Sequence, residues 1–362
     1  MLFRTIEIIV KLMIVIGCGL TLTSVLTWAE RKQSALMQDR IGPNRANIFK
    51  FTLFGLFHPM ADGIKMIMKE DFIPKKGIKL LHTLAPMIAL FPVFLILAAI
   101  PFGDTLIIGD KEVHLQVIKL NIGIIFILGI ASTAIFGTIL AGYSSGNNYS
   151  MFGGMRAASQ MISYEIGMGI SLIGLLMVYQ TAQLDVMVKM QGEMLWGFLP
   201  KWGIVVQPFA FFLFMAAAIG ENKRTPFDLP EGESEIIGYF LEYSSMKFAM
   251  FFMAEFTEIV ISSALITTLF FGGYQIPYLF ETGFHFPWGT IIQLNHYTVV
   301  IIQTTGFALK VLFFCWLMLL LRWTLPRVRY DQMMNIGWKI LLPLGLLNLF
   351  ITGIIIMWIG TI

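Results

Sequence analysis

The chain contains little charge. Only 13% of its 362 residues are charged, whereas 57% are hydrophobic, and its mean hydropathy is +0.77. These values lie well outside the range of soluble globular proteins. Irregular backbone cannot face hydrocarbon, and a membrane-spanning helix needs about 20 mostly apolar residues. The sequence therefore predicts an all-α polytopic membrane protein.

The chain also contains few metal ligands and no nucleotide motif. Cys18 and Cys315 are lone thiols within apolar runs, which excludes a disulfide framework and a Cys-rich iron–sulfur or zinc site. No G-x-x-x-x-G-K-[ST] loop and no strand-associated G-x-G-x-x-G is found, and nothing indicates nucleic-acid binding. Axial heme ligands on facing spans are not expected either, because every histidine falls in a loop or at a span end. We therefore expect this chain to carry no prosthetic group. The histidines are His58, His82, His114, His285 and His296.

Eight long apolar runs predict about eight transmembrane helices in a single domain covering 1–362. The first run is too long for a signal-peptide core and is interpreted as a retained span. No inverted repeat of the kind found in many secondary transporters is visible. The runs fall near 6–29, 80–102, 117–142, 161–182, 203–221, 246–271, 298–321 and 338–359.

Lys and Arg are distributed unequally over the connections. The second, fourth and sixth connections hold only Lys111, Lys189 and Lys201, and most other cations lie in the odd-numbered ones. Because cytoplasmic loops are enriched in Lys and Arg, the odd connections are predicted to be cytoplasmic and both termini external. The predicted cytoplasmic loops are about 30–79, 143–160, 222–245 and 322–337.

The first of these loops contains an amphipathic segment. Between Phe49 and Lys69, aromatic residues and Met alternate with spaced Lys. The segment is expected to be a helix that lies on the membrane surface or an ordinary surface helix packed on the spans. Both alternatives place Asp62 near the interface.

Several charged stretches follow one another along most of the chain: AERKQSALMQDRIGPNR (29–45), GLFHPMADGIKMIMKED (55–71), RAASQMISYE (156–165), RTPFDLPEGESEIIGY (224–239), MAEF (253–256) and PRVRYDQMMNIGWK (326–339). In this order they resemble the quinone-chamber membrane subunit of respiratory complex I, the family of the mitochondrial subunit 1 and the bacterial H subunit. That resemblance implies a subunit of proton-translocating NADH:quinone oxidoreductase in the inner membrane of a bacterium, with quinone as substrate. FMN and iron–sulfur clusters are then expected in partner subunits. The implied partners are the peripheral-arm quinone-site subunits, small membrane subunits, antiporter-like subunits and membrane lipids.

A basic constellation joins the first and seventh connections. Any single Arg there has an equally good explanation in the positive-inside rule or in binding of lipid headgroups. Here the cations alternate with acids, which favours specific pairing. By resemblance, the residues that line or support the quinone tunnel are Arg31, Arg40, Asp62, Arg322 and Arg327.

An acidic constellation follows the fifth span and continues into the sixth. Glu255 is expected about 13 Å along its helix at 1.5 Å per residue, a depth at which carboxylates are costly and usually functional. Helix capping explains Asp228 equally well. Glu258 has no firm counterpart in the family and is not assigned. Between Glu235 and Glu242 the chain is one residue shorter than the family pattern, which affects the register of Glu242. By resemblance, the proton path comprises Glu165, Glu221, Glu231, Glu233, Glu235, Glu242 and Glu255.

Two other functions stay open at this point. A homologous subunit of a membrane-bound hydrogenase-type complex would anchor a peripheral arm and couple ions without binding quinone. A stand-alone ion-coupled transporter is disfavoured, because the sequence lacks inverted repeats and its charge is concentrated on one side.

Overall fold

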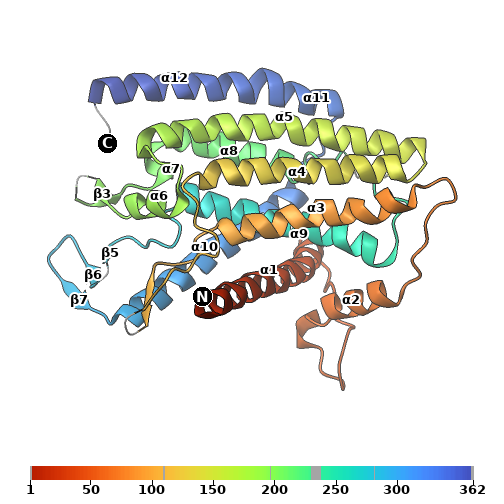
Figure 1. Cartoon of the computed structure of the whole chain (residues 1–362), viewed down its shortest axis with the longest axis horizontal. Helices are drawn as coiled ribbons and strands as arrows, with labels where there is room; N and C mark the ends of the chain where they lie inside the picture. The colour runs from red at the N-terminus through yellow and green to blue at the C-terminus, as the bar shows by residue number, and fades with distance from the viewer. Residues whose placement is uncertain (1, 109–110, 196, 230–237, 281, 360–362) are drawn as a thin grey trace.

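The computed structural model describes residues 2–108, 111–195, 197–229, 238–280 and 282–359. Long helices form one bundle, with short strands only in the connections at one end (Figure 1). The prediction of an all-helical polytopic fold is confirmed. The helices are α1 (Leu2–Met37), α2 (His58–Met68), α3 (Lys79–Ala99), α4 (Gly123–Ser144), α5 (Asn148–Tyr179), α6 (Leu184–Gln191), α7 (Gly203–Val206), α8 (Pro208–Glu221), α9 (Ser245–Phe270), α10 (His296–Thr324), α11 (Tyr330–Asn335) and α12 (Leu342–Ile359), with the short 3₁₀ turn η1 (Leu53–Gly55) and the π-helical turn η2 (Ile336–Leu341).

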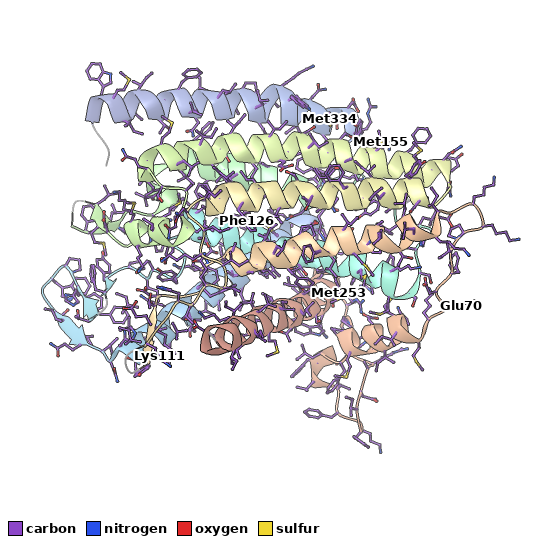
Figure 2. The ribbon with its side chains drawn as sticks, viewed as in Figure 1. Glu70, Lys111, Phe126, Met155, Met253 and Met334 are labelled. Carbon is purple, nitrogen blue, oxygen red and sulfur yellow. The ribbon has the colours of Figure 1, made fainter. Side chains whose placement is uncertain are left out.

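The two ends of the bundle differ in structure. The α2 end carries α2 and the long connection after α1, and the strand end carries every described strand (Figure 1). Glu70, just beyond α2, and Lys111, in the first hairpin, mark these two ends in Figure 2. All strand pairs are antiparallel and short. The strands are β1 (Leu106–Ile108), β2 (Lys111–Val113), β3 (Met194–Leu195), β4 (Leu199–Pro200), β5 (Leu279–Phe280), β6 (Gly283–His285) and β7 (Ile291–Gln293).

Helix α9 lies at the centre of the bundle. Every residue from Ile259 to Phe270 is buried, and the helix packs on α1, α3 and α10. On one side of it, α3, α4, α5 and α8 follow one another, and α12 covers α5 (Figure 1). Small residues allow close approach, because a Cβ on Gly137 of α4 would lie 2.6 Å from the backbone nitrogen of Ala89 in α3. The core consists of one large cluster of buried apolar residues and two smaller ones among the same helices.

Seven of the described helices are long and apolar enough to cross a membrane. The fifth predicted span, 203–221, is instead divided into α7 and α8, and α8 has only 14 residues. The division falls at Gln207, because Pro208 has no backbone N–H to continue a helix from α7. At 1.5 Å per residue, α8 is about 21 Å long and shorter than the hydrocarbon layer of about 30 Å.

The break between α7 and α8 carries a buried polar cluster. The Gln207 side chain donates to the Thr352 hydroxyl at 2.8 Å and accepts from the Asn348 amide at 3.2 Å. Both partners belong to α12. Buried polar groups are costly unless they are hydrogen-bonded, so these bonds hold α12 against the break.

Two predicted connections differ from the structure. The loop expected over 143–160 reduces to residues 145–147, because the Asn147 side chain caps α5 by accepting from the Tyr149 N–H at 3.0 Å. In the first connection, α1 continues to Met37 before the chain leaves the bundle. The surface helix expected between Phe49 and Lys69 is present as α2, which is tied to α9 by the Ser245 hydroxyl at 3.0 Å from the Met66 carbonyl oxygen.

Candidate functional site

An ion-pair cluster at the α2 end joins three distant parts of the chain. The Glu30 carboxylate accepts a hydrogen bond from the Arg224 guanidinium at 2.6 Å and another from Arg322. Glu30 is 8% exposed. The Arg224 guanidinium also lies over the Phe256 ring, 4.0 Å from its centroid. One carboxylate therefore connects α1, the connection after α8 and the end of α10.

This cluster forms one wall of a cavity of about 390 Å³. Several phenylalanine rings line it as well. A cavity lined by both charged groups and aromatic rings suits a flat, partly polar ligand. Its lining comprises Thr27, Glu30, Arg31, Arg224, Phe240, Leu241, Phe248, Phe251, Phe252, Glu255, Phe256 and Arg322. We call it the charged cavity.

A second cavity adjoins the charged cavity between α1, α2 and α9. Its volume is about 360 Å³, and both cavities are lined by Thr27, Arg31, Phe248 and Phe252. The Arg31 guanidinium bridges α1 to α2 through Asp62 at 2.5 Å. The two cavities together form a slot that runs from the α2 surface toward Glu30.

On the inner side of the charged cavity, Glu255 begins a series of polar groups. Its carboxylate accepts from the Tyr239 hydroxyl at 3.1 Å. One helical turn further along α9, the Glu258 carboxylate lies 3.5 Å from the Lys223 ammonium. Residues three apart on a helix share a face, so Glu255 and Glu258 point to the same side of α9.

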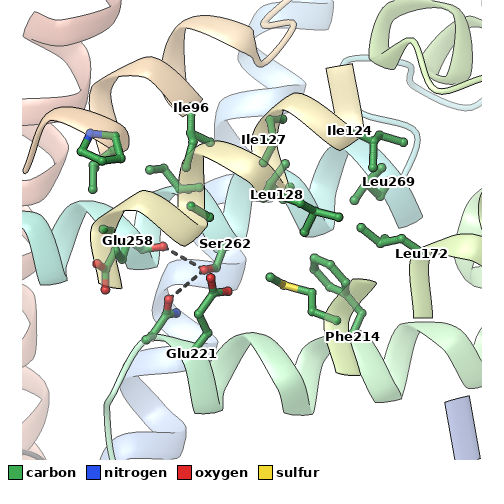
Figure 3. Close-up of a pocket in the computed structure, with 18 of the residues that line it drawn as sticks. Ile96, Ile124, Ile127, Leu128, Leu172, Phe214, Glu221, Glu258, Ser262 and Leu269 are labelled. Atoms are coloured by element: carbon green, nitrogen blue, oxygen red, sulfur yellow. Dashed lines mark hydrogen bonds between the residues drawn. The ribbon is translucent and has the colours of Figure 1, made fainter. Parts of the chain in front are cut away.

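Glu258 and Glu221 both line a third cavity, between α3, α4, α5, α8 and α9. Beside them the Ser262 hydroxyl donates to the Asn222 side chain at 3.0 Å and to the Glu258 backbone carbonyl oxygen at 2.9 Å (Figure 3). The cavity has a volume of about 50 Å³, enough for about three water molecules. Beyond the carboxylates its walls are apolar, with Leu172 and Leu269 among the lining residues.

Glu165 extends this series toward α4. It accepts from the Ser132 hydroxyl. Its helix α5 packs on α8, which carries Glu221, and α8 in turn packs on α9, which carries Glu258. Four carboxylates thus follow one another from the charged cavity into the bundle, in the order Glu255, Glu258, Glu221 and Glu165.

Asp228 lies outside the membrane-spanning segments, in the connection after α8. Burial raises the pKa of its carboxyl to about 6, although Arg322 and Arg327 act in the opposite direction. The connection is held in place by the Gln160 amide, which donates to the Phe227 carbonyl oxygen at 2.7 Å. The Val328 N–H, from the last connection, donates to the Pro226 carbonyl oxygen at 3.0 Å. Asp228 can therefore change its charge near neutral pH at a fixed position.

The structure brings together six of the nine described residues that the sequence pointed to. Arg31, Asp62, Arg322 and Glu255 line the two joined cavities, and Glu165 and Glu221 belong to the inner series. The other three described residues lie elsewhere. Arg40 is exposed beyond the end of α1, and Arg327 is exposed near Asp228. Glu242 accepts a hydrogen bond from the Asn147 amide at 2.9 Å, beside the turn between α4 and α5. Glu231, Glu233 and Glu235 lie outside the described residues.

Sequence reasoning missed two groups that the structure places in this series. Glu258 was not assigned, although its spacing of three from Glu255 was a usable signal. In the sequence, Lys223 is only one cation of a loop, yet in the structure it is 4% exposed. Its burial depends on the fold of the connection after α8, which no periodicity in the sequence reveals.

Fold and site define a polytopic helical membrane protein that contains a charged cavity connected to buried carboxylates. A family model described as NADH dehydrogenase matches residues 10–353, and the chain belongs to this family. Relatives include an H subunit of NADH-quinone oxidoreductase from Cytophaga hutchinsonii, 44% identical over 96% of this chain and 97% of the relative. The corresponding subunit of Flavobacterium johnsoniae is 40% identical over 97% and 95%. That of Thermomicrobium roseum is 41% identical over 94% and 93%.

Proposed function

We propose that this chain is a membrane subunit of a proton-translocating NADH:quinone oxidoreductase, in which it forms the quinone chamber with the peripheral arm. The observation that carries the proposal is the slot of two joined cavities that leads from the α2 surface to Glu30 and continues into the series of buried carboxylates. The NADH-quinone oxidoreductase relatives, similar over nearly the whole chain, support the same function.

The slot suits a quinone in both shape and polarity. The quinone headgroup enters the charged cavity, where guanidinium groups of Arg31 and Arg322 can donate to its carbonyl oxygens. The isoprenoid tail lies in the second cavity, which is lined by Met66, Phe252 and Met253. Arg40 and Arg327 support the entrance from outside, and Asp62 holds Arg31 in position.

Reduction of the quinone takes up two electrons and two protons. The electrons come from iron–sulfur clusters and FMN in partner subunits. The negative charge that quinone reduction brings into the charged cavity acts on the Glu255 carboxylate, and protons then move along Glu258, Glu221 and Glu165. Glu231, Glu233, Glu235 and Glu242 complete the proposed path, which leads to the small membrane subunits and the antiporter-like subunits.

The proposed location is the inner membrane of a bacterium. The distribution of Lys and Arg supports an orientation with the α2 end on the cytoplasmic side and both termini on the external side. The slot then opens toward the side on which a soluble peripheral arm can bind.

Replacement of Glu221 tests the path. Glu221→Gln keeps the shape but removes the proton-accepting group, and we expect NADH:quinone reductase activity in membranes to fall by roughly tenfold or more. The matched control is Glu112→Gln, because Glu112 is exposed in the β1–β2 hairpin. Equal rates in the two variants would refute the path.

The co-purifying chains distinguish the proposal from a hydrogenase-type complex. Chains that bind FMN and NADH should accompany this protein in mild detergent. Recovery of a hydrogenase large subunit in their place would refute the assignment to an NADH:quinone oxidoreductase.

A further inference from the structure

A deep apolar groove lies between α1, α3, α9 and α10 and shares no lining residue with the charged cavity or with the cavity beside α2. Its volume is about 440 Å³. Ile14 and Leu312, both in its lining, are 59% and 43% exposed, so the groove opens on the outer surface of the bundle. Hydrocarbon of the bilayer therefore has access to it.

The groove is as long as one leaflet. Its α1 wall extends from Lys11 to Leu22, which is about 17 Å at 1.5 Å per residue. The hydrocarbon core is about 30 Å thick, so one leaflet contributes about 15 Å. Lys11 and Glu30 are separated by about 29 Å along α1. With Glu30 at one boundary of the hydrocarbon, Lys11 lies near the other.

Two opposite charges lie at the end of the groove that Lys11 marks. The Lys11 ammonium lies 2.5 Å from the Glu7 carboxylate, one turn earlier on α1, and their side chains are only 17% and 23% exposed. A purely anionic headgroup would be attracted by Lys11 and repelled by Glu7. A zwitterionic headgroup with a phosphate and a primary ammonium complements both charges.

We propose that the groove is a binding site for one phospholipid of the leaflet opposite Glu30, with phosphatidylethanolamine chemistry. One acyl chain fills the groove along α1 and α10. The phosphate meets Lys11, and the ammonium meets Glu7. A lipid held in this way fills the space between α1 and α10 and keeps α1, which carries Glu30 and Arg31, at a fixed distance from Arg322.

A larger side chain that occupies the groove tests whether a lipid binds there. Ala308 lines the groove, whereas its neighbour Leu309 is 63% exposed and does not line it. Native mass spectrometry of the protein, purified with its accompanying chains in mild detergent, counts the phospholipids retained. Ala308→Trp should lose one phosphatidylethanolamine per chain, with occupancy lowered roughly tenfold or more, and Leu309→Trp should retain it.

Recognition of the headgroup is tested by substitution of Glu7 and Lys11, which lie on the outer face of α1, so that the core is unchanged. In nanodiscs that contain equal amounts of phosphatidylethanolamine and phosphatidylglycerol, wild type should retain the ethanolamine lipid. The double variant Glu7→Gln, Lys11→Gln should lose that preference by roughly tenfold, since charge-assisted hydrogen bonds are removed.

Three results would overturn the proposal. The first is equal retention in Ala308→Trp and Leu309→Trp, with both eluting as wild type on size exclusion. The second is an isoprenoid quinone, rather than a phospholipid, as the molecule lost from Ala308→Trp. The third is an unchanged lipid preference in the double α1 variant.

Discussion

At the α2 end, Glu30 holds Arg224 and Arg322 inside a cavity, whereas at the strand end Asp185 and Asp104 bind Lys119 and Lys189 at 3.3 Å each. The two lysine side chains are 43% and 47% exposed. The side chains of Glu30 and Arg224 are each 11% exposed. Solvent screens these two strand-end pairs and is largely excluded from the pairs of Glu30. The two strand-end pairs hold connections in place, and the pairs of Glu30 maintain a desolvated site.

The largest effect is expected at Glu30. Glu30→Ala leaves two guanidinium groups desolvated, and removal of one partner of a buried pair costs about 3–5 kcal/mol. Thermal unfolding of the purified complex should shift strongly downward, and quinone reductase activity should be lost. An unfolding midpoint close to that of wild type would show that water reaches this cluster as freely as it reaches the strand end.

A second comparison concerns two carboxylates of the α2 end. Glu258→Gln should lower quinone reductase activity by roughly tenfold to a hundredfold, as expected for a group that transfers protons. Glu70→Gln should stay within about twofold of wild type, because Glu70 is exposed just beyond α2. An equal loss in the two variants would mean that the path does not depend on the buried carboxylate of α9.

Lys223 complicates this test, because Glu258→Gln leaves its ammonium buried without that carboxylate. The double variant Lys223→Met, Glu258→Gln restores charge balance. It should recover the unfolding midpoint but not the activity. Recovery of both would mean that Glu258 serves only to neutralise Lys223.

Asp228 gives a pH-dependent effect of intermediate size. The pKa of its carboxyl is raised from 3.8 to about 6, so between about pH 4 and 6 the folded protein holds a proton that the unfolded chain has released. Stability therefore falls as pH rises through this window, by up to about 3 kcal/mol. In Asp228→Asn, the slope of unfolding free energy against pH should be smaller over pH 4–6. An identical slope in both proteins would contradict the raised pKa.

The smallest effects are expected at the strand end. Lys119→Gln and Lys189→Gln each remove a partly exposed pair, worth about 0–1 kcal/mol. Quinone reductase activity should stay at the wild-type level, and the unfolding midpoint should shift slightly in low salt only. A strong loss of activity in either variant would remove the distinction between the two ends.

Much of the fold could be predicted from the sequence, because long apolar runs have few structural solutions in lipid. Spans such as 80–102 and 246–271 were placed to within a few residues of α3 and α9. The start of α5 was missed because Arg156 and the polar residues around it suggested a loop. In the structure the Asn147 cap starts the helix, and the Gln160 side-chain nitrogen donates to the carbonyl oxygens of Gly220 and Phe227.

Partners far apart in the sequence were not predictable. Lys310 lies within the seventh predicted span, and nothing nearby in the sequence indicates its role. In the structure its ammonium donates to the carbonyl oxygens of Phe271, Gly273 and Gln275 at 2.8, 3.0 and 2.7 Å, just beyond the end of α9. A cation there is favoured by the helix dipole. Such a contact exists only once α9 and α10 are packed, as does the approach of Glu258 to Glu221.

The polar cluster at the α7–α8 break also determines the register of α12. Apart from Asn348 and Thr352, α12 consists of apolar residues and glycine, so apolar packing distinguishes weakly between positions one turn, about 5.4 Å, apart along α5. Such a slip would carry Asn348 and Thr352 away from Gln207 and leave all three unsatisfied in the low-dielectric interior. A glutamine at a helix break thus helps to fix the axial position of a whole peripheral helix.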